Sequence, residues 1–266
     1  MIPVLHTLFC IFITGFETVV LFPIAMLMML VTWRRDGEMW MVANIWSQVL
    51  IWAGGAKLEV IGKEHLDPKR PTIYICNHQS TLDAPVLFKS LWPVPFRYVS
   101  KHTLKYVPVT GWYLIAGGYI FINRSNRRAA VQTLDAAALR IRAGTSIVVF
   151  PEGTRSETGA ILPFKKGPFA LAVKAKVAIC PVTIEGTGKV MPKNSWRITP
   201  GPVRVKVGSP IDPTPYGNDR EALMHAVREV MINQSLALGG KGGDRNDDVA
   251  AQGEEGVGRD AEAQAQ

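Results

Sequence analysis

The stretch Thr72-Ile-Tyr-Ile-Cys76, followed by Asn77-His78-Gln79-Ser80-Thr81-Leu82-Asp83, decides how this chain is interpreted. The first five residues form an apolar run that predicts a buried strand. The polar loop after it places a histidine and an aspartate five positions apart. A histidine next to a carboxylate can take a proton from a hydroxyl group, because the carboxylate fixes the imidazole tautomer and stabilises the imidazolium that forms.

The spacing of His78 and Asp83 also predicts local structure. On a regular helix, five residues turn the chain by roughly 140°, so the two side chains would not meet. A loop that leads into a helix brings them together, and Pro85 suits the first turn of that helix. We therefore expect His78 in the loop and Asp83 at the helix start, with Ser80 or Thr81 as the capping residue. His65 is the other candidate for the residue that takes the proton, but no motif surrounds it.

Outward from this loop, short apolar runs alternate with helical patterns. Helices are expected at 127–142, 166–176 and 219–238, and strands at 58–61, 72–76, 96–100, 119–123, 146–150, 178–184 and 203–208. This alternation predicts a single α/β domain with a mixed, largely parallel sheet of about seven strands flanked by helices. In such sheets, reactive residues gather after the carboxyl ends of the strands.

The amino-terminal part predicts attachment to a membrane. Glu17 is the only charged side chain in the first 33 residues, with histidine counted as neutral, and Pro23 interrupts the apolar run. We expect either one kinked span or two short helices in one leaflet. Arg34 and Arg35 follow and predict that the rest of the chain is cytoplasmic. The uncharged segment 39–52 contains three tryptophans, which suit either the headgroup layer or a buried core helix.

Composition divides the chain into a membrane-associated segment (1–54), a catalytic domain (55–238) and a disordered acidic tail (239–266). The formal net charge is +8, and the tail has seven acids against three bases, so the rest carries +12. This excess suits lipid headgroups, phosphorylated substrates or an acidic carrier protein. Nucleic acid is disfavoured because the basic residues are dispersed. Three cysteines without metal-like spacing indicate buried thiols in a reducing compartment and no metal site.

Basic residues follow other predicted strands. Arg124 ends Gly118-Tyr-Ile-Phe-Ile-Asn-Arg124, and Arg155 lies in Phe150-Pro-Glu-Gly-Thr-Arg-Ser156. Two guanidinium groups at strand ends can clamp one phosphate, and Lys101 adds a point charge. Gly153 permits close approach of the backbone to a ligand. Glu152 either binds a substrate hydroxyl or braces an arginine.

The four segments NHQSTLD, GYIFINR, FPEGTRS and CPVTI (180–184) occur in this order. Over about residues 56–210 the chain resembles the glycerolipid acyltransferases, above all bacterial 1-acyl-sn-glycerol-3-phosphate acyltransferases. Asn123 departs from the aspartate that many relatives carry. The resemblance implies His78 as general base held by Asp83, and a site for the glycerol phosphate that comprises Lys101, Phe121, Arg124, Glu152, Gly153, Thr154 and Arg155.

The same resemblance implies the reaction and its setting. An acyl thioester of acyl carrier protein or coenzyme A serves as co-substrate, with no resident cofactor, and lysophosphatidate accepts the acyl group on its sn-2 hydroxyl. Backbone amides at the start of the helix after His78 stabilise the oxyanion. The enzyme is expected on the bacterial inner membrane, with its active site facing the cytoplasm. Alternatives are another acceptor (glycerol 3-phosphate, another lysophospholipid or a lyso-aminolipid) or a non-catalytic lipid-binding protein.

Overall fold

A seven-stranded sheet forms the centre of the computed structural model, which describes residues 2–34, 36–123 and 127–244. The strand order is β1-β7-β6-β2-β5-β3-β4, and every neighbouring pair is parallel except β6 and β7. The strands are β1 (Ala56–Ile61), β2 (Ile73–Cys76), β3 (Phe96–Lys101), β4 (Ile120–Ile122), β5 (Ser146–Val149), β6 (Ile179–Glu185) and β7 (Gly201–Val207). The predicted mixed, largely parallel sheet is thus confirmed, with each strand close to its expected place.

Strand β2 shows why this sheet has two buried faces. Its side chains alternate between the two hydrophobic clusters, with Tyr74 and Cys76 in one and Ile73 and Ile75 in the other. All four are buried, which explains the continuous apolar run in the sequence. A loop that follows this strand therefore starts from one of the most firmly held positions in the molecule.

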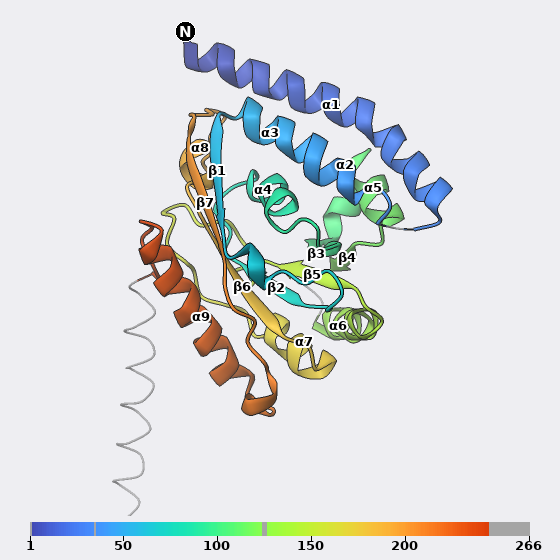
Figure 1. Cartoon of the computed structure of the whole chain (residues 1–266), viewed down its shortest axis with the longest axis vertical. Coiled ribbons are helices and arrows are strands. Elements are labelled where there is room, and N and C mark those ends of the chain that lie inside the picture. Colours follow the sequence, from blue (N-terminus) through green and yellow to red (C-terminus); the bar gives the residue numbers. More distant parts are fainter. Residues whose placement is uncertain (1, 35, 124–126, 245–266) are drawn as a thin grey trace, which may run out of the picture.

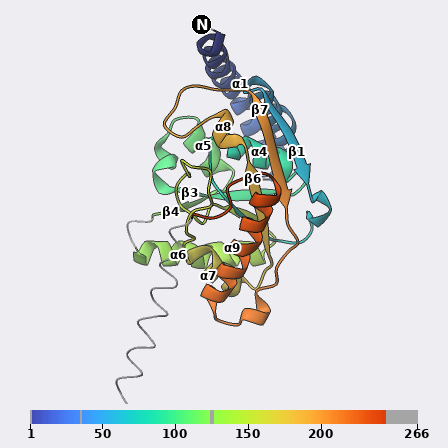
Figure 2. The same ribbon diagram turned by 90° about the vertical axis from the view of Figure 1, so that its left-hand side faces the viewer.

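Helices cover both faces of the sheet (Figures 1 and 2). Phe88 and Leu114, from α4 and α5, belong to the first cluster, whereas Ala138, Phe169 and Val227, from α6, α7 and α9, belong to the second. The bounds are α4 (Asp83–Ser90), α5 (Thr110–Ala116), α6 (Arg127–Arg142), α7 (Gly167–Ala175), α8 (Thr187–Val190) and α9 (Arg220–Ala237). The three helices expected beyond residue 126 are all present.

The amino-terminal segment forms a helical layer at one end of the molecule (Figure 1). Helix α1 (Ile2–Thr32) continues through Pro23 as one helix, so the expectation of two short helices is wrong. It is followed by α2 (Met39–Met41), a π-helical stretch (Val42–Trp46) and α3 (Ser47–Ala53). Within the stretch from α2 to α3, Met39, Leu50 and Ile51 are buried, whereas Trp40 and Trp52 are exposed. Part of segment 39–52 is thus buried as a core helix would be, and contact of its exposed tryptophans with a headgroup layer stays a prediction.

The carboxyl-terminal part is ordered beyond α9. The backbone of Ile161 accepts from Asp244 N and donates to Gly242 O, and it bridges to Gly243. The predicted tail begins at 239, yet residues 239–244 are attached to the domain in this way. Residues 245–266 lie outside the described part of the chain.

Candidate active site

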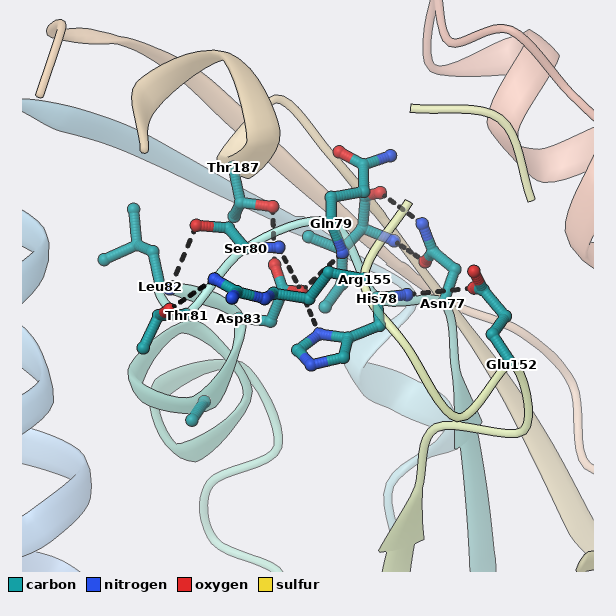
Figure 3. Close-up of polar contacts among 12 residues, drawn as sticks. Asn77, His78, Gln79, Ser80, Thr81, Leu82, Asp83, Glu152, Arg155 and Thr187 are labelled. Atoms are coloured by element: carbon teal, nitrogen blue, oxygen red, sulfur yellow. Dashed lines mark hydrogen bonds and ion pairs between the residues drawn. The ribbon is translucent and has the colours of Figure 1, made fainter. Parts of the chain in front are cut away.

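His78 and Asp83 meet as their spacing predicts. His78 lies in the loop after β2 and Asp83 is the first residue of α4, and Nδ1 of the imidazole is 2.7 Å from Oδ2 of the carboxylate. The same oxygen accepts from the backbone amides of Gln79 (2.7 Å) and Ser80 (2.9 Å). The loop is thus wrapped around the buried carboxylate (Figure 3). The carboxylate fixes both the ring and the loop that carries it.

The expected capping residues have other roles. Leu82 occupies the N-cap position of α4 and makes no side-chain cap. Ser80 Oγ donates to Met191 O and accepts from Leu82 N, and Thr81 Oγ1 accepts from Arg155. The prediction that Ser80 or Thr81 caps the helix is therefore wrong, because both hydroxyls bond to groups outside the first turn of α4.

The imidazole of His78 is held on its face as well as at its edge. It stacks on the ring of Phe150, with centroids 4.0 Å apart and an interplanar angle of 16°. Its side chain is 23% exposed, and Nε2 points away from Asp83 (Figure 3). Because Nδ1 is engaged with the carboxylate, Nε2 is the nitrogen available to a substrate in the cavity that His78 lines.

Glu152 supports the His78 loop from behind. Its Oε1 accepts from His78 N (3.0 Å) and its Oε2 from Leu162 N (3.4 Å), and the residue is 4% exposed. Burial raises the pKa of this carboxyl from its ordinary 4.5 to about 8. Both oxygens accept from backbone amides, and the charge of Arg228 also acts on the carboxyl. Binding of a substrate hydroxyl by Glu152 stays a prediction.

A cavity of about 740 Å³ opens in front of His78. Its inner wall is apolar, with contributions from α1 and from the helices beneath it: Leu21, Phe22, Trp46, Phe88 and Leu114. Cations line it as well, namely Lys101, Arg155 and Lys193. The cavity therefore suits a molecule that has both a hydrocarbon part and an anionic part.

Four of the predicted substrate-binding residues line the cavity, and three of them are consecutive in the sequence. Gly153, at a φ of 73°, Thr154 and Arg155 all line the cavity, as does Lys101. Arg155 Nη1 donates to Thr81 Oγ1 at 2.9 Å, which turns the guanidinium toward the histidine loop (Figure 3). Sequence reasoning missed Lys193, whose Nζ donates to Arg155 O at 3.0 Å.

Two residues that were predicted to bind substrate are not seen in the cavity lining. Phe121, on β4, is half-buried and packs against the hydrophobic cluster, and it is not part of the cavity lining. Arg124 lies outside the described residues. Within residues 2–34, 36–123 and 127–244, no group of three or more histidine, cysteine, aspartate or glutamate side chains has the arrangement of a metal site.

The amides expected to stabilise an oxyanion donate elsewhere. Gln79 N and Ser80 N bond to Asp83 Oδ2, Leu82 N bonds to Ser80 Oγ, and Asp83 N bonds to Ser80 O. These four amides are thus engaged within the loop, and stabilisation of an oxyanion by amides at the start of α4 stays a prediction.

Sequence reasoning also missed Thr187, the first residue of α8, whose hydroxyl donates to Asp83 Oδ1 at 2.5 Å. The two residues are 104 positions apart. No local pattern connects them, and only the neighbouring positions of β2 and β6 in the sheet bring them together.

An imidazole–carboxylate pair at the mouth of a cavity that is partly apolar and partly cationic defines a class of protein: one equipped to deprotonate a hydroxyl on an amphipathic anion. The comparisons with known proteins agree with that class. The acyltransferase family model matches residues 57–185.

The relatives narrow the class further. The chain is 34% identical to a 1-acyl-sn-glycerol-3-phosphate acyltransferase of Chlamydomonas reinhardtii, over 72% of this chain and 57% of the relative, and 34% identical to that of Saccharomyces cerevisiae, over 75% and 67%. The crystal structure of the 1-acyl-sn-glycerophosphate acyltransferase of Thermotoga maritima superposes with a TM-score of 0.74 at 30% identity, covering 86% of this chain and 92% of that one. The chain belongs to the acyltransferase family. The match spans a little over half the length of the Chlamydomonas relative.

Proposed function

We propose that this protein transfers an acyl group from a thioester of acyl carrier protein or coenzyme A to the sn-2 hydroxyl of 1-acyl-sn-glycerol 3-phosphate, which gives phosphatidate. One observation carries the proposal: His78, held by Asp83, lines a single cavity that has both an apolar wall and a cationic lining. The apolar part suits a hydrocarbon chain and the cations suit the phosphate.

In the proposed reaction, Nε2 of His78 takes the proton of the hydroxyl as its oxygen attacks the thioester carbonyl carbon. The tetrahedral intermediate collapses, the carbon–sulfur bond breaks, and the thiolate takes the proton from the imidazolium. Asp83 stabilises the imidazolium in between, from 2.7 Å. Transfer is direct, because neither hydroxyl between His78 and Asp83 is paired with a base: Ser80 Oγ donates to Met191 O and Thr81 Oγ1 accepts from Arg155.

The first test is product formation by purified protein. His78→Ala is expected to abolish phosphatidate formation while the variant keeps its fold and its binding to vesicles, because only the proton acceptor is lost. His225→Ala, an exposed histidine on α9, is the matched control and retains activity. Substantial turnover by His78→Ala would exclude this histidine as the base.

The acceptor is decided by mass spectrometry of products from mixed lysolipids with both thioester donors. We expect lysophosphatidate to be consumed in preference to the other acceptors. Lys101, Arg155 and Lys193 favour its phosphate over the headgroups of other lysophospholipids and lyso-aminolipids, and the apolar wall favours its acyl chain, which glycerol 3-phosphate lacks. Preference for an acceptor without a terminal phosphate would assign these cations another role. Binding of lysolipid without any consumption of thioester would favour a non-catalytic lipid-binding protein.

We further propose that the protein lies on the cytoplasmic face of the inner membrane with α1 along the leaflet. Helix α1 is the one described helix long and apolar enough to cross a bilayer. Its 31 residues extend about 46 Å, well beyond the ~30 Å of hydrocarbon in a bilayer. It is also bonded to the domain along its length: His6 Nε2 lies 2.8 Å from Ala53 O, and Trp46 Nε1 donates to Thr18 Oγ1 at 3.3 Å.

These contacts favour an orientation along the membrane surface, because a crossing α1 would draw α3 and α5 into the bilayer with it. The outer side of this layer is strongly apolar, with exposed Phe12, Phe16, Val19, Leu27, Val31, Trp40, Trp52 and Trp112. Tryptophan suits the interface between headgroups and acyl chains. Since Leu21 and Phe22 of α1 also line the cavity, a lysolipid can enter the site from the leaflet.

An epitope tag at the amino terminus separates the two orientations in sealed inside-out membrane vesicles. Protease added outside is expected to remove the tag as readily as it reaches the catalytic domain. Protection of the tag until detergent is added would mean that α1 crosses the membrane.

A further inference from the structure

The carboxylate of Asp83 is held by four hydrogen bonds, and they are unequally divided between its oxygens. His78 Nδ1, Gln79 N and Ser80 N all bond to Oδ2, at 2.7, 2.7 and 2.9 Å. Thr187 Oγ1 donates to Oδ1 at 2.5 Å. Asp83 and Thr187 are both fully buried. Thr187 is therefore the side chain that holds the carboxylate at Oδ1, on the side away from His78.

This matters because the terminal torsion of an aspartate has broad, two-fold minima and is not fixed by rotamer preference. Rotation about this torsion moves both oxygens at once, so it is opposed by the three donors on Oδ2 and also by the donor on Oδ1. The Thr187 hydroxyl adds this second hold from the opposite side of the group. The lone pair of Oδ2 that meets His78 Nδ1 then keeps one direction, and the imidazole keeps one position.

The backbone around Thr187 is fixed by independent contacts. Asn77 Nδ2 donates to Ile184 O at 2.9 Å and Asn77 Oδ1 accepts from Ile184 N at 2.7 Å, so the end of β6 is bonded to the histidine loop. Gly186 has a φ of 98°, and a Cβ there would collide with Pro202 O. A hydroxyl presented from so rigid a turn can fix its acceptor, because it costs little further entropy to hold it.

We propose that Thr187 is a positioning residue of the acyl transfer: its hydroxyl fixes the carboxylate of Asp83, and through it the imidazole of His78, in the geometry that accepts the substrate proton. The inference rests on the proposed function for its kinetic consequence. Thr187 does not line the cavity and touches no substrate, so its loss is expected to lower kcat and leave substrate binding unchanged.

The kinetic test compares Thr187→Val, Thr187→Ser and a matched control, Thr183→Val. Thr183 is also a fully buried threonine of the same segment, but its hydroxyl donates to Gln234 Oε1 on α9. A hydrogen bond to a charged group corresponds to about a tenfold to hundredfold change in rate. Thr187→Val is expected to lose kcat by this factor, with KM for lysophosphatidate nearly unchanged. Thr187→Ser is expected to have a kcat near that of the wild type, and Thr183→Val is expected to have the wild-type kcat.

Three kinetic results would overturn the proposal: wild-type kcat in Thr187→Val, an equal loss in Thr183→Val, or failure of Thr187→Ser to restore the rate. A double variant tests the route of the effect. In an Asp83→Ala background, Thr187→Val is expected to cause no further loss, because the group it positions is absent. A further loss of the same size there would show that Thr187 acts by another path.

A spectroscopic readout separates this proposal from the proposed function. In histidine-labelled protein, the ring-nitrogen resonances of His78, assigned from their loss in His78→Ala, report its bond to Asp83. They are expected to shift or broaden in Thr187→Val and to stay in place in Thr183→Val and Thr187→Ser. Unshifted resonances in Thr187→Val would refute the positioning role even in a protein with no acyl-transfer activity, and shifted resonances would support it there.

Discussion

Replacement of Asp83 by asparagine removes the charge beside His78 with the least change of shape. The amide oxygen can take the place of Oδ2 and keep the donors from His78, Gln79 and Ser80, which lie 2.7 to 2.9 Å away. The amide nitrogen then faces the Thr187 hydroxyl, which can accept a hydrogen bond as well as donate one. We therefore expect a folded variant whose histidine loop is intact but uncharged at its centre.

The size of the effect follows from the ion pair that forms during reaction. When His78 takes the proton, the imidazolium and the carboxylate are opposite charges, with Nδ1 and Oδ2 2.7 Å apart. With charge centres about 4 Å apart and an effective dielectric constant of about 20, their attraction is about 4 kcal/mol. Loss of that stabilisation lowers kcat by about three orders of magnitude. KM for lysophosphatidate is expected to change little, because Asp83 does not line the cavity.

The assay is steady-state phosphatidate formation in detergent micelles with a fixed thioester donor. Asp219→Asn is the matched control, because this residue caps α9 through bonds to Glu221 N and Ala222 N and asparagine caps equally well. Equal thermal unfolding of both variants and the wild type shows that the fold is kept. If folded Asp83→Asn retains more than about a tenth of the wild-type kcat, the imidazolium needs no carboxylate and the reasoning fails.

Three further predictions address stability and binding. Burial raises the Glu152 pKa from 4.5 to about 8, so between these pH values the folded state binds more protons than the unfolded state. The free energy of unfolding should therefore fall as pH rises from 4.5 to about 8, by up to about 1.4 kcal/mol per pH unit relative to Glu152→Gln. Urea unfolding at several pH values measures this difference. A pH-independent difference between the two proteins would contradict this. Arg155→Ala should raise KM for lysophosphatidate about tenfold or more, in initial-rate measurements; a change confined to kcat would refute phosphate binding. Gly186→Ala should lower the free energy of unfolding in urea by about 3 kcal/mol or more, because the added Cβ meets Pro202 O. Gly144→Ala, also at positive φ but in open space, should lower it by about 1 kcal/mol. Equal losses in the two variants would disprove the collision.

Several elements of the site follow from local sequence. The apolar run before Asn77 indicated β2, and the five-residue spacing of His78 and Asp83 indicated a loop that leads into a helix; both are present. The run around Arg155 follows β5 and lines the cavity as expected. These inferences succeed because burial on a strand and the turn into a helix are recorded in residues that are close in the chain.

The partners of these residues were not predictable in the same way. Glu152 was expected to contact substrate or an arginine, but its oxygens accept from backbone amides. Pro23 left both a single span and two short helices open, and the structure shows one helix, α1. Sequence patterns report whether a residue is buried or polar, and they do not report which group it faces.

The sequence by itself determined an α/β sheet with a histidine and an aspartate at a strand end, an apolar amino-terminal helix and arginine-bearing loops. Only the tertiary structure decided that Thr187 donates a hydrogen bond to Asp83 and that Lys193 donates one to the backbone of Arg155. It also decided that residues of α1 line the cavity. The reason is the strand order, which sets β2 between β5 and β6. Loops that are 70 to 110 residues apart in the chain become neighbours at one edge of the sheet, and no periodicity within a single segment encodes that adjacency.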